Sequence, residues 1–209
     1  MDFSQTVFMQ TNKIDWIASP MSGVYRKPLA REESERGHAT SLVRYEAGSV
    51  FRSHPHPLGE EILVLQGVFS DEKGDYKAGS YFRNPPGSSH APHSAEGCLL
   101  LVKLHQFQQS DLNQVYIETP NIWSSDDEGF LRLYDYGPER VWLVRMGDSK
   151  DILDQLGLSC SVELFVISGE AKYGDREISS GDWLREPDFS SDLLLIDSVC
   201  FMWIKSGHF

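Results

Sequence analysis

The 209-residue sequence has little cysteine and no concentrated positive charge. Its cysteines, Cys98, Cys160 and Cys200, lie far apart and form neither a disulfide framework nor a CxxC zinc motif. The net charge is −12 and no cluster of Lys and Arg is present, which argues against direct nucleic-acid binding, because such binding needs basic side chains that neutralise phosphates. The same deficit disfavours binding to anionic membrane surfaces.

Long hydrophobic runs and helical periodicity are also scarce. No apolar stretch approaches the roughly 18 residues of a membrane helix. Residues 1–16 lack the basic region and the apolar region of a signal peptide. Because the few cysteines are scattered as well, we expect a cytoplasmic protein that is not attached to a membrane.

Short apolar runs separated by Gly, Pro, Asp and Ser dominate the sequence. Such runs include TSLVRY, EILVLQG, CLLLVKL, VWLVRMG, VELFVISG and VCFMWIK. Their length and their content of Val, Ile, Leu, Phe and Trp are typical of β-strands. Many strands of this kind at regular spacing predict an all-β sandwich or barrel.

The sequence repeats itself with an offset of 102 residues. Residues 61–67 (EILVLQG) align with residues 163–169 (ELFVISG), and the alignment continues without a gap to residue 107. Residues of several chemical kinds match in this one register: Gly79 with Gly181, Arg83 with Arg185, Pro85 with Pro187, Cys98 with Cys200 and Lys103 with Lys205. A duplication explains these matches better than two unrelated β segments of similar composition.

The repeat predicts two β-domains, at residues 38–107 and 138–209. Residues 108–137 would link the two domains and carry strands of their own. Residues 1–37 would form an N-terminal extension that packs on the barrel, with the charged stretch of residues 31–36 as a solvated loop.

Two histidines one residue apart precede the central strand of the first copy. Alternate side chains of a strand share a face, so His54 and His56 lie about 6.5 Å apart along the chain and can bind one metal ion. Prolines follow both histidines and remove backbone donors, as expected at the mouth of a barrel. Glu60 is close enough to add a carboxylate, and His90 from a neighbouring strand can supply a fourth ligand.

These residues resemble the two motifs of the cupin superfamily, G-x5-H-x-H-x3,4-E-x6-G and G-x5-P-x-G-x2-H-x3-N. Nine fixed positions are satisfied: Gly48, His54, His56, Glu60, Gly67, Gly79, Pro85, Gly87 and His90. The sequence departs from the motifs at Ser94, which stands in place of the final Asn. Residues 15–107 are similar in particular to the cupin domain of ChrR-type anti-sigma factors, which release an extracytoplasmic-function sigma factor under singlet-oxygen stress.

The resemblance implies a double-stranded β-helix, or jelly roll, here as a bicupin of two tandem barrels. It also implies one divalent metal held by His54, His56, Glu60 and His90. Zinc is the metal of the ChrR branch, and Fe(II), Mn or Ni would suit other cupins. ChrR proteins carry in addition an N-terminal helical domain with a His-x3-Cys-x2-Cys type zinc motif that clamps the sigma factor, and this sequence lacks that motif. We therefore expect the sensor half alone, or a free-standing cupin.

The second copy provides an internal control for the metal site. At the offset of 102 residues, the three histidines and the glutamate are all replaced, and the corresponding residues are Leu156, Leu158, Val162 and Asp192. We therefore expect the second domain to hold no metal. His93, three residues beyond His90, is expected at the rim of the site and not as a ligand.

Three functions are open at this stage. The first is a sensory or regulatory module, in which the metal or a small molecule beside it changes the barrel and a separate regulatory protein reads the change. The second is a metal-dependent dioxygenase that acts on a small diketone or enediol, with Glu60 as the base. The third is a storage or structural β-protein, which would not need the ligand set. We place the sensory module first, as a monomer or homodimer.

Overall fold

The computed structural model describes residues 2–32, 37–148, 151–158 and 160–209. The chain divides into two compact units. Unit 1 comprises Ile14–Trp123, and unit 2 comprises Asp2–Lys13 together with Ser124–Phe209. Residues 33–36, which make up most of the stretch expected to be a solvated loop, lie outside the described residues.

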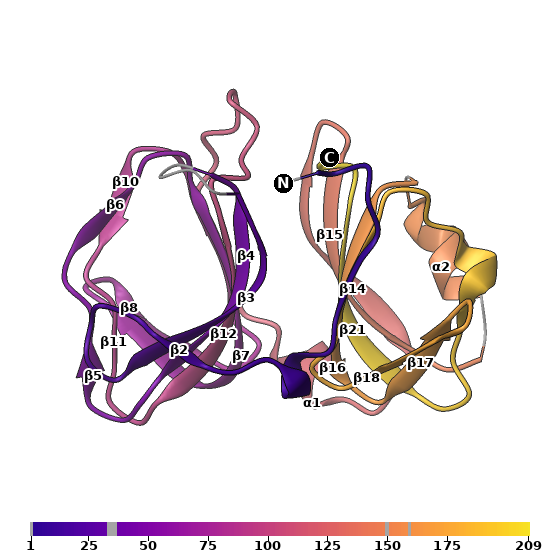
Figure 1. The fold of residues 1–209 in the computed structure, drawn as a ribbon, viewed down its shortest axis with the longest axis horizontal. Coiled ribbons are helices and arrows are strands. Elements are labelled where there is room, and N and C mark those ends of the chain that lie inside the picture. Colours follow the sequence, from indigo (N-terminus) through magenta and orange to yellow (C-terminus); the bar gives the residue numbers. More distant parts are fainter. Residues whose placement is uncertain (1, 33–36, 149–150, 159) are drawn as a thin grey trace. The chain divides into compact units, whose positions relative to one another are not determined.

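Unit 1 consists of short strands joined by turns (Figure 1). Its strands are β2 (Ile17–Ala18), β3 (Val24–Arg31), β4 (Ala39–Tyr45), β5 (Ser49–Val50), β6 (His54–His56), β7 (Glu60–Asp71), β8 (Gly74–Lys77), β9 (Tyr81–Asn84), β10 (Ser88–His90), β11 (His93–Ser94), β12 (Cys98–Leu104) and β13 (Val115–Ile117). The main sheet has the antiparallel order β13–β9–β7–β12–β4–β3–β2. Strands β8 and β11 also pair with β7, β5 pairs with β11, and β6 pairs with β10.

Unit 2 contains β1 (Val7–Met9), β14 (Gly129–Tyr136), β15 (Glu139–Met146), α2 (Asp151–Leu156), β16 (Val162–Ser168), β17 (Glu170–Tyr173), β18 (Arg176–Ser179), β19 (Trp183–Glu186), β20 (Leu194–Leu195) and β21 (Cys200–Ser206). One sheet has the order β1–β19–β16–β21–β15–β14, and a smaller sheet has the order β18–β17–β20. The N-terminal strand β1 thus closes the edge of a sheet built from the other end of the chain, and Figure 1 shows this indigo segment alongside the strands of unit 2.

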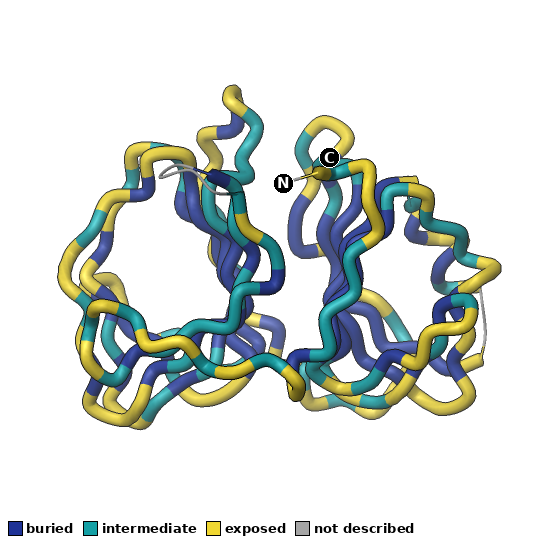
Figure 2. Tube along the Cα trace, in the orientation of Figure 1, coloured by how far each residue is buried: buried dark blue, intermediate teal, exposed yellow. Residues whose placement is uncertain are grey.

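The two faces of β7 are set by the alternation of its side chains. Ile62 and Val64 point into the core of unit 1, where they pack with Val43 and Leu100. Glu61 and Leu63, which alternate with these two residues along the strand, point to the opposite face. The sequence pattern predicted this alternation but did not determine which face was inside. In each unit, buried positions lie mainly along the strands and exposed positions mainly in the connecting loops (Figure 2).

The strand registers repeat between the units. In each unit a buried glutamate on one strand is paired with an arginine on one neighbouring strand and a lysine on the other. These residues are Glu61, Arg83 and Lys103 in unit 1, and Glu163, Arg185 and Lys205 in unit 2. Equivalent residues are 102 positions apart, so the pairing supports the duplication inferred from the sequence.

The all-β prediction is confirmed in its coarse form, because strands dominate both units and the sheets are antiparallel. Two short helices, α1 (Pro120–Ser124) and α2, were not predicted. In α2, Leu153 and Leu156 are three residues apart and both buried, a spacing too short to stand out in a strand-rich sequence. Within the described ranges, no helix combines the length and the apolar character needed to cross a membrane. The tandem barrels and the domain boundaries stay predictions.

Candidate metal centre

Strands β6, β7 and β10 bring the four predicted ligands together. His54 and His56 lie in β6, which pairs with β10 so that His54 is opposite His90. Glu60 is the first residue of β7. One donor atom from each of the four residues lies within 4.8 Å of the other three. His54 is half-buried and the other three side chains are buried.

The separations of the donor atoms fit a single bound ion. Oε2 of Glu60 lies 3.2 Å from Nε2 of His56 and 3.4 Å from Nε2 of His90. Two donors held about 2.1 Å from one ion in tetrahedral geometry are about 3.4 Å apart. The centroids of the three imidazole rings are between 4.6 and 5.1 Å apart, and the rings meet edge to face. The rings therefore surround a common point.

Hydrogen bonds on the far side of two imidazole rings fix their tautomers. Nδ1 of His54 lies 3.1 Å from the carbonyl oxygen of Arg52, which can only accept, so Nδ1 donates. Nδ1 of His56 lies 3.0 Å from the hydroxyl of Ser88, whose own proton is donated to the carbonyl of Pro85 at 2.6 Å. Nδ1 of His56 therefore donates as well. In both rings the Nε2 lone pair is left for the centre of the site.

The third ring is held by a carboxylate. Nδ1 of His90 lies 3.3 Å from Oδ2 of Asp71, a buried side chain at the end of β7. Oδ1 of Asp71 accepts hydrogen bonds from the backbone amide of Lys73 at 2.8 Å and from the hydroxyl of Tyr76 at 3.1 Å. Asp71 is thus fixed from both sides, and it leaves Nε2 of His90 as a free acceptor or metal ligand. This carboxylate–histidine arrangement is the usual support of a metal-binding imidazole.

Burial keeps the metal-free site close to neutral. Burial raises the pKa of Glu60 to about 7. Burial, and then the neighbouring rings His90 and His54, lower the pKa of His56 to about 3. The rings are therefore neutral at physiological pH, so the short Glu60–His56 distance is not a charged ion pair. Among the described residues, the buried Nε2 atom of His56 has no hydrogen-bond partner. Burying a polar atom in this way costs free energy, and a bound metal ion would remove that cost.

A cavity of about 480 Å³ adjoins the four donors within unit 1. Its walls come from the inner faces of β3, β4, β7 and β12, and include apolar side chains such as Val43, Ile62, Phe69 and Leu100. Cavities of this size and mixed lining are typical of small-molecule sites. A metal bound by the four residues would therefore face space that a ligand can enter.

The residues that support the ligands were not predicted from the sequence. Asp71 and Ser88 orient imidazole rings, and Nδ2 of Asn84 donates to Oε2 of Glu60 at 3.3 Å. Each comes from a strand or turn that meets its partner only through folding. The one available signal was weak: a buried carboxylate near the end of the glutamate-bearing strand is a common support for a metal-binding histidine.

Other candidates of the sequence lie outside the quartet. Glu61 accepts hydrogen bonds from the hydroxyl of Tyr81 at 3.1 Å and from Arg83 at 3.0 Å, on the face of β7 opposite the site. His93 lies in β11, opposite Val50 of β5, and does not join the four donors. In unit 2, the positions equivalent to the ligands include residues of the hydrophobic core, Leu156 and Val162.

Solved structures share this fold. A candidate dioxygenase from Nostoc punctiforme matches with a TM-score of 0.68 at 15% identity, covering 96% of this chain and 82% of that protein. YlbA from Escherichia coli matches with a TM-score of 0.69 at 12% identity, covering 100% and 93%. The pirin YhhW from Escherichia coli, in complex with nickel(II), matches with a TM-score of 0.67 at 13% identity, covering 96% and 98%. At these identities the likeness concerns the fold alone.

The family is shown by a comparison of sequences. None of the curated proteins compared with the chain matches it. The sequence model of the ChrR cupin-like domain matches residues 4–108, which is half of the chain. The match runs from the N-terminal segment through the four clustered donors to the end of β12, and it confirms the resemblance inferred from the two motifs. The chain belongs to the family of ChrR cupin-like domains.

Proposed function

We propose that unit 1 binds one divalent metal ion through His54, His56, Glu60 and His90 and acts as a sensory or regulatory module. The observation that supports the metal site is the convergence of three Nε2 lone pairs and one carboxylate oxygen within 4.8 Å. When bound, the metal supplies Lewis acidity and a place for a small ligand to coordinate. The protein itself supplies the fixed tautomers and the adjoining cavity.

Zinc is the metal that the ChrR family suggests, with Fe(II), Mn and Ni as alternatives. Three imidazoles and one carboxylate suit all four metals. Four protein ligands would close a tetrahedral zinc site, whereas a six-coordinate metal would keep two positions for a ligand. Metal identity thus bears directly on function.

The metal site is tested by metal analysis of protein purified without added metal. We expect about one equivalent per chain in the wild type and none after the double substitution His54→Ala/His56→Ala. His93→Ala is the matched control, because it removes a neighbouring histidine that is not in the quartet. Unchanged metal content in the double variant would exclude the site.

The regulatory role rests on the family and on the two-unit chain. In our proposal the chain is a bicupin in which unit 2 is a copy of the scaffold without the ligand set. A metal-bound ligand would change unit 1, and a separate protein would read the change. The protein would be cytoplasmic, as a monomer or homodimer, and it would bind its ligand without consuming it.

A metal-dependent dioxygenase is the second candidate, and the cavity beside the donors favours it. The cavity could hold a small diketone or enediol next to the metal, with apolar walls that exclude water. Glu60 would act as the base, because burial gives its carboxyl a pKa near neutrality, which suits proton transfer.

Oxygen consumption separates the two candidates. Native protein with its own metal is incubated with acetylacetone as a simple diketone, and dissolved oxygen is followed with an electrode. Zinc as the only metal, together with no oxygen uptake, would exclude the dioxygenase. Steady uptake that is lost in the His54→Ala/His56→Ala variant would instead overturn the purely regulatory role.

A further inference from the structure

Arg26 is a charged residue on the inner face of unit 1. It lies in β3, where alternate residues point inward: Val24 belongs to the hydrophobic core, and Arg26 and Pro28 line the cavity. The intervening Tyr25 points outward, where the guanidinium of Arg44 stacks on its ring. An arginine on the inner face of a barrel, beside core side chains, is unusual, because charges are normally kept in water or paired.

The guanidinium of Arg26 is left available inside the cavity. It makes no hydrogen bond or ion pair with any described residue, although its charge acts on His54 and Glu60. Glu60 is already used by the metal site. Arg26 is half-buried and has no carboxylate of its own, so it is available for an anion that comes from outside the chain.

Tyr45 adds a second polar group to the same wall. Tyr45 is only 6% exposed. It lines the cavity from β4, which pairs with β3. Its hydroxyl makes no hydrogen bond to any described residue. Tyr45 lies two residues along β4 from Val43, the pairing partner of Arg26, so the two side chains line the same wall of the cavity. A phenol and a guanidinium on one wall of a cavity offer donors that match the two oxygens of a carboxylate.

The charge around the cavity has the sign that attracts an anion. Its described lining includes three arginines, Arg26, Arg31 and Arg52, and a single acidic residue, Glu60. Arg31 and Arg52 are exposed. The chain as a whole carries a net charge of −12, so this clustering is not a consequence of a basic composition. Such a field concentrates small anions at an opening.

We propose that the cavity of unit 1 binds a small organic carboxylate, held at its charged end by Arg26 and Tyr45, with its apolar body against Val43 and Leu100. The other end of the ligand would face the metal, and in that respect the inference rests on the proposed metal site. A carboxylate with an apolar body is favoured over inorganic phosphate because Val43, Ile62, Phe69 and Leu100 also line the cavity, and phosphate has no apolar part to place against them.

The probe is butanoate, with its neutral isostere butanamide and inorganic phosphate as comparisons. Isothermal titration calorimetry of the metal-loaded full chain is expected to detect butanoate and neither of the others. Arg26→Met keeps the length of the side chain and removes its charge, and we expect it to weaken butanoate binding by about tenfold or more. Arg26→Lys should recover part of that loss, and Tyr45→Phe should weaken binding several-fold without disturbing the fold.

Arg44→Met is the matched control. It removes the same charge from the adjacent strand, but its side chain lies on the outer face against Trp16 and Tyr25, so butanoate affinity should not change. Equal butanoate affinity in the wild type and Arg26→Met would overturn the inference, as would binding of butanamide or phosphate as tight as that of butanoate. Metal content is measured in every sample. If wild type and Arg26→Met both carry metal and bind butanoate equally well, the carboxylate site alone is rejected. If the purified wild type takes up no metal and still binds butanoate more tightly than Arg26→Met, the metal site alone is rejected.

Discussion

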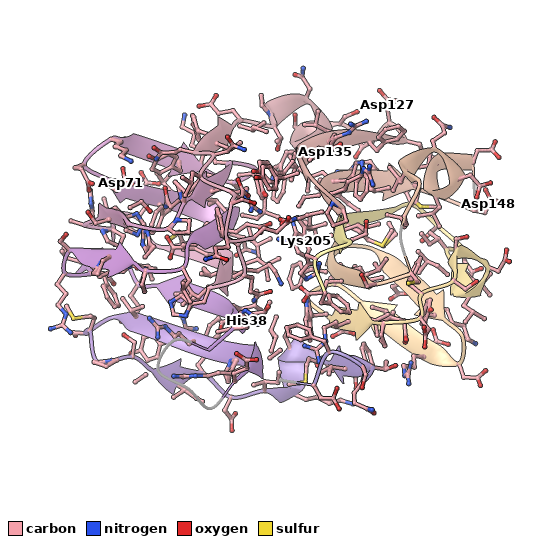
Figure 3. All side chains as sticks on the ribbon, turned by 90° about the horizontal axis from the view of Figure 1, so that it is seen from above. His38, Asp71, Asp127, Asp135, Asp148 and Lys205 are labelled. Carbon is pink, nitrogen blue, oxygen red and sulfur yellow. The ribbon has the colours of Figure 1, made fainter. Side chains whose placement is uncertain are left out.

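Nδ1 of His90 donates to the carboxylate of Asp71 across 3.3 Å, and both side chains are buried in unit 1. Figure 3 labels Asp71 among the side chains of this unit. A carboxylate that accepts the distal proton of an imidazole fixes the ring and makes its other nitrogen a better metal ligand. Asp71 is therefore a positioning residue that acts on the metal through His90.

Replacement of Asp71 by Asn should lower metal affinity without removing a ligand. We expect a loss of about 10–100-fold, because the substitution keeps the shape of the side chain and removes its charge. The dissociation constant is measured by competition with a chromogenic chelator. Asp75→Asn is the control: Asp75 belongs to the same hairpin and is exposed, and among the described residues its side chain accepts a hydrogen bond only from Ser70. An equal loss of metal affinity in both variants would mean that the effect comes from removing one negative charge near the site, and not from the hydrogen bond to His90.

Metal affinity should depend on pH through Glu60 and not through the histidines. Without metal, burial raises the pKa of Glu60 to about 7, and burial lowers the pKa of His56 to about 3 and that of His90 to about 4. Below pH 7 an incoming metal must displace the proton of Glu60, so affinity should fall by about tenfold per pH unit between pH 7 and pH 5. The imidazoles of His56 and His90 are neutral in that range and add no slope.

Calorimetry in two buffers of different ionisation enthalpy measures the protons released on metal binding. At pH 6 we expect about one proton in the wild type and none in Glu60→Gln, which binds metal more weakly but with a flat pH profile between 5 and 7. The metal-free wild type should also be destabilised as pH rises through 7, since a carboxyl whose pKa is raised by folding stabilises the protein while it is protonated. Release of two or more protons would show that imidazoles titrate in this range.

The ligand set could be predicted from the sequence because its geometry is mostly local. The alternation of a strand puts His54 and His56 on one face, and Glu60 follows within a few residues. Asp71 and Arg26 could not be predicted in their roles, since each reaches the site through strand pairings that bring distant segments together.

The pairing of the N-terminal strand was beyond sequence reasoning for the same reason. Val7 pairs with Arg185, and the segment VFM contains nothing that selects a partner so far along the chain. The duplication, by contrast, could be inferred from the sequence, because residues that pair across neighbouring strands are the same in both copies. Glu61 pairs with Arg83, and Glu163 pairs with Arg185. The orientation of β7 needed the structure, since both of its faces are buried.

Breaking the buried ion pairs of Arg83 should strongly destabilise unit 1. Its guanidinium is fully buried, contacts Glu61 at 3.0 Å and Asp111 at 2.8 Å, and stacks on the ring of Phe107. Removal of one carboxylate leaves buried charge without its partner, so Asp111→Ala should cost on the order of 3–5 kcal/mol of unfolding free energy. Urea denaturation followed by circular dichroism measures the loss.

Asp135→Ala is the matched control for Asp111→Ala. Asp135, labelled in Figure 3, pairs with Arg132 at 3.0 Å and Arg140 at 3.5 Å, but all three side chains are at least partly exposed. Exposed ion pairs are worth about 0–1 kcal/mol, so this variant should unfold close to the wild type. If the two variants lost the same stability, burial would not be what makes the Arg83 pairs important.

Gly67 should resist substitution because its backbone and its surroundings both exclude a side chain. Its φ is +71°, and a Cβ would lie 2.0 Å from the carbonyl oxygen of Gly97. The equivalent Gly169 has a φ of +95° and would place a Cβ 2.7 Å from the carbonyl oxygen of Val199, which explains why the duplication kept both glycines. Gly67→Ala combines backbone strain with a backbone clash. Gly48→Ala, at a φ of +79° with open space around its Cβ, carries the strain alone.

The difference between these two variants isolates the clash. Gly48→Ala should cost about 1–3 kcal/mol, the usual range for a left-handed conformation without glycine. Gly67→Ala should cost clearly more, because the carbonyl of Gly97 belongs to the turn before β12 and cannot withdraw without disturbing the pairing of Cys98 with Gly67. Thermal unfolding of both variants and of Gly169→Ala provides the comparison. If Gly67→Ala and Gly48→Ala lost the same unfolding free energy, the turn at Gly97 would be able to move away from the added Cβ at no cost. Backbone conformation alone would then require glycine at position 67.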